Sequence, residues 1–206
     1  MKPIATVINN NQPGWTNIIE IEPNVTLSVG TRLYLADPVV PLGSPLGGGF
    51  LGGIGYAPDG PYALIFAPKA EGEKMNLLYK IRDLYTSDGT NSDVDGFANS
   101  ELINDDNHPA AQYCRSLRIG GVDDWSLPSR DELAMGERNL GPNRKNTPEP
   151  FRAGGVEAFE ECWYWSSTER ASNSSYAWVV DFDGGGQGTT NKSYYCGVRA
   201  VRRLKL

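Results

Sequence analysis

The pattern of apolar and polar residues predicts short strands near the start of the chain. Every second residue is apolar in "VTLSV" and in "LYL", within residues 25–35, and prolines lie on either side of these runs. Period-two alternation interrupted by proline is typical of short strands. We therefore predict an N-terminal arm of two or three strands over residues 1–45.

A glycine-rich segment and an apolar run follow the arm. "PLGGGFLGGIG", residues 45–55, has the composition of a hinge or a set of tight turns, which places a domain boundary there. "YALIFAPK", residues 62–69, lies between two prolines and reads as a buried strand. We expect one further domain over residues 46–206.

Two helices are signalled by their ends. "HPAAQYCRSLRIGG" places Pro109 at a first helical position, and two glycines follow the apolar face. Ser129 and Glu132 form a Ser-x-x-Glu capping box, which predicts a second helix from Ser129 to Leu140. A shorter helix is expected near Ser100.

Three strand candidates, "CWYWSST", "YAWVVDFDGG" and "SYYCGVRAVRRL", come late in the chain. An antiparallel sheet that forms late in the chain and packs against earlier helices is an α+β arrangement. We expect Trp125 and Leu127 to pack beneath the second helix. The residues expected to have structural roles are Cys114, Trp125, Ser129, Glu132, Trp165 and Trp178.

Composition narrows the classes of partner. The chain holds 24 glycines and 14 prolines with 39% hydrophobic residues, which favours a loop-rich fold, and its net charge of −6 disfavours nucleic acid. We expect no membrane span, because no apolar run approaches about 18 residues. The first residues lack the apolar core of a signal peptide, so synthesis in the cytosol is expected. Three cysteines are too few for a disulfide scaffold, and we expect them to be reduced.

The candidate catalytic and metal-binding groups have simpler interpretations. His108 is the one histidine, and no nucleophile motif accompanies it. "NSDVDG" resembles the front of a calcium loop through Asp93 and Asp95, but Leu102 stands where the bidentate glutamate belongs. We expect no metal, no cofactor and no catalysis, and a weak calcium site near the two aspartates stays an alternative.

Several motifs together resemble the Lcl C-terminal domain family. "AAQYCRSLRIGGVDDWSLPSRDEL", "YWSSTE", "YAWVVDF" and "YYCGVRAVR" occur in the family's order, and the likeness covers roughly residues 46–203. The resemblance implies a C-type-lectin-like fold, with two helices on a twisted antiparallel sheet and long loops. Such domains occur in bacterial surface adhesins and bacteriophage virion proteins and are not known as catalysts.

One cysteine departs from the family pattern. The resemblance implies a cysteine at the position of Ala200, tied to the equivalent of Cys114. Here Cys196 lies four residues earlier, about 13 Å away along a strand. We therefore expect no bond between Cys114 and Cys196.

A ligand site is expected in two segments rich in Ser, Asn, Thr, Gly and Tyr, residues 168–176 and 183–195, because adaptable binding loops have this composition. The candidate ligand-binding residues are Glu169, Arg170, Asn173, Ser175, Tyr176, Gln187, Thr190, Asn191, Ser193 and Tyr194.

The leading hypothesis is a bacteriophage virion protein located on the particle. Its arm binds other virion proteins or forms a homo-oligomer, because exposed strand edges call for a partner. Its head decorates the particle or binds a glycan or protein on the host surface. The alternatives are a bacterial surface adhesin and an oxidase of the formylglycine-generating type. The oxidase is disfavoured because Cys162 and Cys196 lie far apart in the sequence.

Overall fold

The structure, a computed structural model, describes residues 5–8, 18–21, 40–58 and 60–206. The chain divides into two compact units, Met1–Val39 and Val40–Leu206. In the first unit, β1 (Ala5–Ile8) pairs antiparallel with β2 (Ile18–Ile21). The described part of the arm therefore contains two strands, whereas the alternation predicted within residues 25–35 lies outside the described residues.

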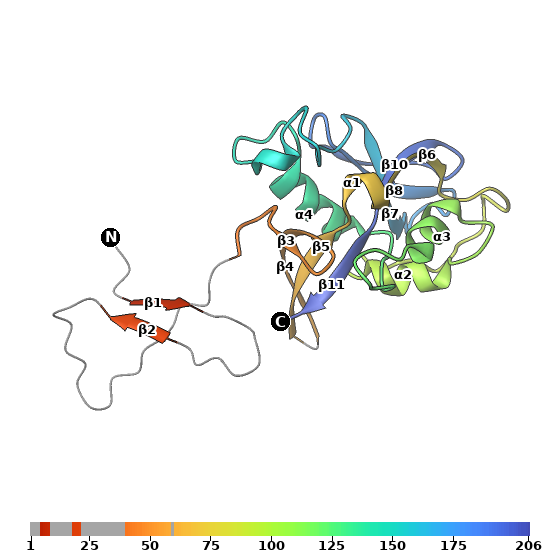
Figure 1. The fold of residues 1–206 in the computed structure, drawn as a ribbon. Coiled ribbons are helices and arrows are strands. Elements are labelled where there is room, and N and C mark those ends of the chain that lie inside the picture. The colour runs from red at the N-terminus through yellow and green to blue at the C-terminus, as the bar shows by residue number, and fades with distance from the viewer. Residues whose placement is uncertain (1–4, 9–17, 22–39, 59) are drawn as a thin grey trace. The chain divides into compact units, whose positions relative to one another are not determined.

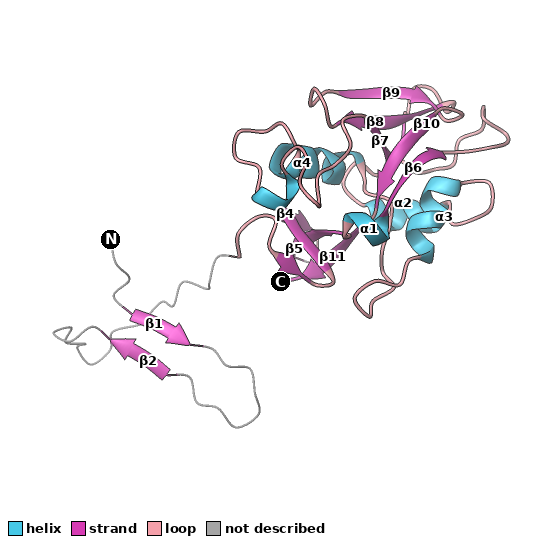
Figure 2. Ribbon diagram, turned by 45° about the horizontal axis from the view of Figure 1, so that its top comes forward, coloured by secondary structure: helices cyan, strands magenta, loops and turns pink. Residues whose placement is uncertain are grey.

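The second unit, which we call the head, is a mixed α+β domain with two sheets (Figures 1 and 2). The strands of the five-stranded sheet, in spatial order, are β6 (Glu73–Leu78), β10 (Tyr195–Arg199), β7 (Trp163–Glu169), β8 (Tyr176–Asp181) and β9 (Gln187–Asn191). Those of the four-stranded sheet are β11 (Val201–Lys205), β5 (Gly60–Phe66), β4 (Gly49–Ala57) and β3 (Pro45–Leu46). All described pairings are antiparallel except that of β10 with β7.

The structure confirms the helices that the end signals in the sequence predicted. They are α1 (Lys69–Gly72), α2 (Gly96–Leu102), α3 (Pro109–Ser116) and α4 (Arg130–Leu140), and Glu149–Phe151 adds a 3₁₀ turn. Pro109 opens α3, and α4 begins with the complete capping box of Ser129 and Glu132. No helix in the described part of the chain is long and apolar enough to cross a membrane.

The last predicted strand is divided between the two sheets. It breaks at Ala200, with β10 before it in the five-stranded sheet and β11 after it in the four-stranded sheet. The Ala200 N–H donates to the Gly72 carbonyl, and the Ala200 carbonyl accepts from the Ala67 N–H, at 3.0 and 2.9 Å. These bonds take the place of ladder bonds, so the one predicted strand serves two sheets.

Of the two predicted alternatives for the glycine-rich segment, a hinge or tight turns, the structure shows a tight turn within a hairpin. Gly47 and Gly48 have φ of +57° and +86° and turn the chain from β3 into β4. The Gly43 N–H donates to the Leu51 carbonyl at 2.8 Å, which ties the preceding residues to the same hairpin. The compact unit that contains this hairpin spans Val40–Leu206.

Two clusters of buried side chains form the core of the head, and they correct the predicted place of Trp125 and Leu127. Both residues lie in the cluster that contains Cys114 of α3, whereas α4 buries Leu133 and Leu140 in the other. The reason is the antiparallel bridge of Ser126 with the start of β11, which turns the residues on either side of Ser126 toward α3.

The structure also shows the burial of the two remaining tryptophans that were expected to have structural roles. Trp165 is fully buried, and Trp178 is half-buried with the Arg130 guanidinium 4.8 Å from its ring centre. Cys114, Cys162 and Cys196 form no disulfide bond in the structure.

Candidate functional site

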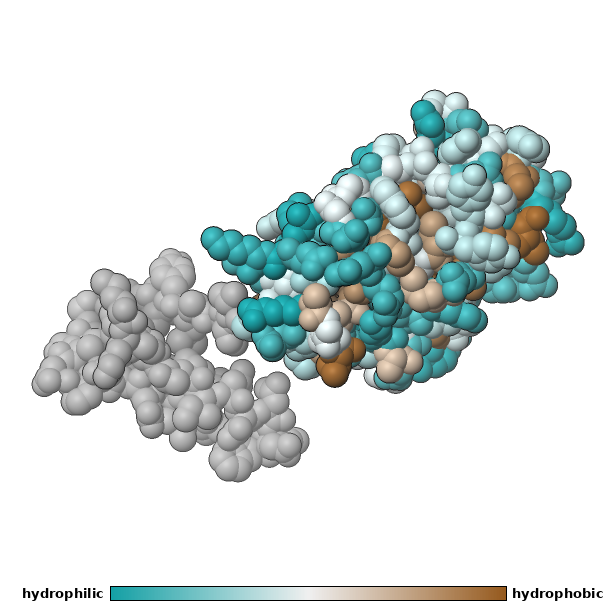
Figure 3. All heavy atoms as spheres, turned by 90° about the horizontal axis from the view of Figure 1, so that it is seen from above, coloured by the Kyte–Doolittle hydropathy of each residue, from teal (hydrophilic) through white to brown (hydrophobic). Residues whose placement is uncertain are grey.

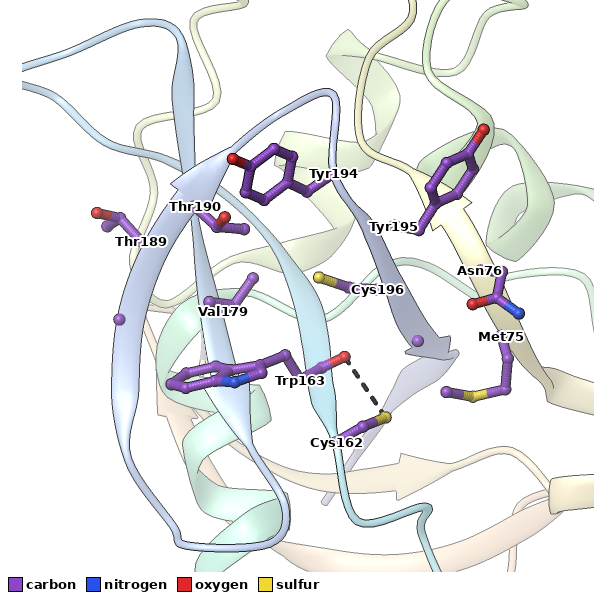
Figure 4. A pocket seen from close by; sticks show the side chains of 12 residues that line it. Met75, Asn76, Cys162, Trp163, Val179, Thr189, Thr190, Tyr194, Tyr195 and Cys196 are labelled. Carbon is purple, nitrogen blue, oxygen red and sulfur yellow. Dashed lines mark hydrogen bonds between the residues drawn. The ribbon is translucent and has the colours of Figure 1, made fainter.

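The five-stranded sheet carries a cleft of about 550 Å³ that is rich in aromatic residues, which we call the aromatic cleft (Figure 4). Strands β6, β7, β8, β9 and β10 and the residues next to them all contribute to it. Its lining consists of Met75, Asn76, Cys162, Trp163, Val179, Gly188, Thr189, Thr190, Tyr194, Tyr195, Cys196 and Gly197.

Three aromatic side chains of the cleft remain exposed to solvent. Trp163 is 42% exposed, Tyr194 61% and Tyr195 67%. In Figure 4, Trp163 lies at one end and the two tyrosines at the other, with Val179 and Cys196 drawn between them. On the face shown in Figure 3, hydrophobic side chains are exposed only in small separate groups among polar ones. The cleft thus brings three exposed aromatic side chains together around one hollow.

Strand geometry explains why Trp163 is exposed. Trp163 and Trp165 stand two residues apart in β7 and so share one face of the sheet. Trp165 lies in the core, where its Nε1 donates to the Leu77 carbonyl at 3.0 Å. Trp163 is the first residue of the strand and extends the same aromatic face to the surface.

A β-bulge brings a polar side chain, that of Asn76, to the side of the cleft opposite Trp163. β10 pairs with Lys74 and Leu77 of β6, and the register shifts between Cys196 and Val198, so Met75 and Asn76 face the region of one β10 residue. Asn76 has φ of +58°, the left-handed conformation that asparagine tolerates better than most residues. Bulges commonly redirect a side chain beside a binding site, and this one brings Asn76 into the cleft lining.

The two thiols of the cleft are protonated at neutral pH. Burial, reinforced by nearby Glu73 and Glu160, raises the pKa of Cys162 to about 11. Burial, followed by the neighbouring Cys162, raises the pKa of Cys196 to about 12. Although the two cysteines are distant in sequence, the fold brings them to one cleft. A protonated thiol is a weak nucleophile and a weak metal ligand.

The predicted ligand residues only partly coincide with the cleft. Thr190 and Tyr194 line it, whereas Glu169 and Arg170 line a neighbouring hollow with Arg130 and Trp178. The side chains of Glu169 and Ser175 are buried. The predicted residues that lie outside both linings are Asn173, Ser175, Tyr176, Gln187, Asn191 and Ser193.

Part of the predicted loop over residues 183–195 is a strand. β9 pairs with β8 in the register Thr190 with Ala177 and Thr189 with Trp178. Two consecutive β-branched residues suit a pleated edge, which is why this polar segment completes the sheet. Sequence reasoning missed Trp163, Tyr195 and Asn76 as cleft residues. The period-two spacing of Trp163 from Trp165 was a usable signal for the first of them.

The aspartates of the calcium-like segment are engaged by protein groups. Asp93 contacts Arg130 at 3.1 Å, and Asp95 caps α2 by accepting from the Ala98 N–H at 3.0 Å. Arg203 also lies 3.4 Å from Asp95. Within the described ranges, no group of three or more His, Cys, Asp or Glu side chains is placed to hold a metal ion.

Comparisons with known proteins give a family and, among solved structures, a distant likeness. The family model described as the Lcl C-terminal domain matches residues 80–202. Among curated proteins, none matches the chain. A solved structure titled as a fimbrial protein from Bacteroides ovatus is 15% identical, with a TM-score of 0.44, over 68% of this chain and 35% of that one. The chain thus spans about a third of that protein's length.

Proposed function

Because the chain belongs to the Lcl C-terminal domain family, we propose that it is a non-enzymatic surface protein whose head, residues 40–206, binds a saccharide in the aromatic cleft. The observation that carries this proposal is the exposure of Trp163, Tyr194 and Tyr195 around one hollow. Large aromatic side chains that remain exposed in a concave site are typical of ligand recognition.

The chemistry of the lining suits a sugar ring. A pyranose presents apolar C–H groups on its faces and hydroxyl groups around its edge, which match aromatic rings and the polar groups of Asn76, Thr189 and Thr190. The lining includes no ionisable group other than thiol and phenol hydroxyls, so nothing in it pairs with a charged substituent. The preferred ligand is therefore an uncharged saccharide.

The same lining argues for binding without catalysis. Glycoside cleavage needs a pair of carboxyl groups, and the cleft lining contains none. Its thiols, with pKa values of about 11 and 12, lack the thiolate character that a copper-dependent oxidase of the formylglycine-generating type requires.

At the finer level, the proposal is that this is a bacteriophage virion protein with a C-type-lectin-like head. The arm supports it. In the described residues β1 and β2 pair only with each other, and an isolated two-stranded hairpin is marginally stable in water. Attachment to other virion subunits, or a homo-oligomer of the arm, would supply the missing partners.

The cleft is tested by a glycan array followed by calorimetric titration of the saccharide that binds. Trp163→Ala and Tyr194→Ala are expected to weaken binding about tenfold or more, a loss of about 1.4 kcal/mol or more. Tyr56→Ala is the matched control, because Tyr56 is 80% exposed and lies outside the cleft lining. An array without hits, or equal losses in all three variants, would refute a saccharide site in this cleft.

The location of the protein distinguishes the virion hypothesis from the adhesin hypothesis. Mass spectrometry of density-gradient-purified particles from the source culture should detect the chain in fixed stoichiometry with capsid or tail proteins. Recovery with the cell envelope, and not with particles, would assign the protein to bacterial surface adhesins.

A further inference from the structure

A fully buried lysine lies between two buried carboxyl groups at one end of the five-stranded sheet. Lys192 follows β9, Glu169 ends β7, and Asp88 belongs to the segment after β6. The Lys192 Nζ lies 2.6 Å from Asp88 Oδ2 and 2.5 Å from Glu169 Oε2. The exposed fraction of the Lys192 side chain is 0%, and that of Glu169 is 3%.

The surroundings of the amine are closed to solvent. The Tyr79 ring centre lies 5.2 Å from the Lys192 Nζ, and Tyr79 is itself fully buried. Burial without water penalises the charged forms of both an ammonium and a carboxylate. A proton passed from the ammonium to an adjacent carboxylate gives a neutral amine beside a neutral carboxylic acid, which are the reactants of amide formation.

The two carboxyl groups differ in their partners. Asp88 also accepts a hydrogen bond from Lys80 and lies 3.3 Å from His108 Nε2. Burial opposes ionisation of Asp88, but its contacts with His108, Lys192 and Lys80 outweigh burial and hold its pKa well below the usual value. Asp88 therefore stays a carboxylate.

Glu169 has Lys192 as its cationic partner, and its other partners are neutral. The Ser87 hydroxyl donates to Oε1 at 2.5 Å and the Asp88 backbone N–H donates to Oε2 at 2.9 Å. Glu169 is thus the carboxyl group with the single cationic contact, and this makes it the acceptor of the amine. An amide at Glu169 also leaves the buried charges of Lys80 and Asp88 paired with each other, whereas an amide at Asp88 would separate Lys80 from its carboxylate.

We propose that the chain forms an intramolecular isopeptide bond between Lys192 Nζ and Glu169 Cδ. One ammonium proton passes directly to Glu169, and the Asp88 carboxylate relays the second from the nitrogen to the departing oxygen. The neutral amine attacks Cδ, and the C–N bond forms as one C–O bond of Glu169 breaks. Of the three ammonium protons, one remains as the amide N–H, and two leave with the departing Glu169 oxygen as water. The step needs no oxidant, cofactor or activated co-reactant.

The fold supplies the two factors that an uncatalysed amide condensation lacks. The amine and carboxyl group are held in contact, which replaces a bimolecular encounter with an intramolecular one. The Ser87 hydroxyl and the Asp88 N–H stand on the oxygens where negative charge develops during attack, and they stabilise it as an oxyanion hole does.

Intact mass spectrometry of the purified full-length chain tests the bond directly. The native protein should weigh one water molecule less than its sequence, with or without Met1, and a proteolytic digest should contain a branched peptide joining Lys192 to Glu169. Lys192→Arg should have the full sequence mass. Lys80→Arg is the matched control within the same network and should still lose water.

Asp88→Asn tests the base while leaving both bonded residues in place, and it should recover the full sequence mass wholly or in large part. The proposal is overturned by a native mass equal to that of the sequence, or by loss of water that persists in Lys192→Arg. A branched peptide that joins Lys192 or Lys80 to Asp88 would likewise overturn Glu169 as the acceptor.

Discussion

The contribution of Glu132 to stability can be predicted quantitatively, because this one buried carboxylate joins three parts of the head. Its Oε2 accepts from the Ser129 N–H at 2.8 Å and from the Gly96 N–H at 3.1 Å. Its Oε1 accepts from Arg203 Nε of β11 at 2.7 Å. The side chain of Glu132 is only 2% exposed, so water cannot readily replace it.

Glu132→Ala should lower the free energy of unfolding by about 4 kcal/mol. Removing one partner of a buried ion pair costs about 3–5 kcal/mol, and each buried N–H left unpaired costs about 1–3 kcal/mol. The contributions do not add in full, because Arg203 keeps Asp95 and the Val94 carbonyl as partners. A loss of this size is a large share of the stability of a typical domain, about 5–15 kcal/mol.

Urea titration followed by tryptophan fluorescence measures the loss, since Trp125 and Trp165 are fully buried and report unfolding. Ser129→Ala removes the cap alone and should cost about 1 kcal/mol. Glu149→Ala, which breaks an exposed ion pair, should cost less than about 1 kcal/mol. If Glu132→Ala costs no more than Ser129→Ala, the capping contact alone accounts for Glu132 and the link to β11 contributes nothing.

Three further predictions concern packing, pH and thiol reactivity. Gly136→Ala should destabilise the head by about 1–3 kcal/mol in a thermal melt, because the added methyl would lie 2.2 Å from Cζ of Phe66; an unchanged midpoint would contradict the close contact. The pKa of Asp88 is lower in the folded protein than in a free aspartate, so ionised Asp88 stabilises the fold above the usual aspartate pKa. This stabilisation is lost as the pH falls toward the folded pKa, and the free energy of unfolding should therefore decline below about pH 4. Acid titration of Asp88→Asn should show a shallower decline. With pKa values of about 11 and 12, Cys162 and Cys196 should react with iodoacetamide at pH 8 at least about tenfold more slowly than in urea, and equal rates would show that the thiols are not shielded.

The helices were predictable because their signals are local. Pro109 opens α3 and Ser129 caps α4 through contacts within a few residues of the chain. The apolar runs likewise located β5, β7 and β8. What the runs do not encode is which strands pair: the break at Ala200 depends on hydrogen bonds to Ala67 and Gly72, which belong to a distant part of the chain.

The aromatic cleft was less predictable, because its residues are distant in sequence and come together only through the order of the strands in the sheet. Trp163 and Tyr194 become neighbours of one cleft because β10 pairs with β7 in parallel, the one parallel contact among the described strands. The burial of Lys192 was equally hidden. Lysine is usually exposed, and its partners Asp88 and Glu169 lie 104 and 23 residues away in the sequence.

Strand β9 links the cleft to the buried lysine. It is the last strand in the spatial order of its sheet, and among the described residues it pairs only with β8. Thr189 and Thr190 of β9 form one wall of the aromatic cleft, and Lys192 holds the next turn of the chain against Glu169 of β7. An edge strand held by a single ladder is prone to fraying, so the contact of Lys192 fixes the wall as well as the turn. A saccharide that binds the cleft should therefore bind more weakly to Lys192→Arg than to the native chain, although Lys192 does not belong to the lining. If affinity is unchanged in that variant, β9 is held in place by its pairing with β8 alone.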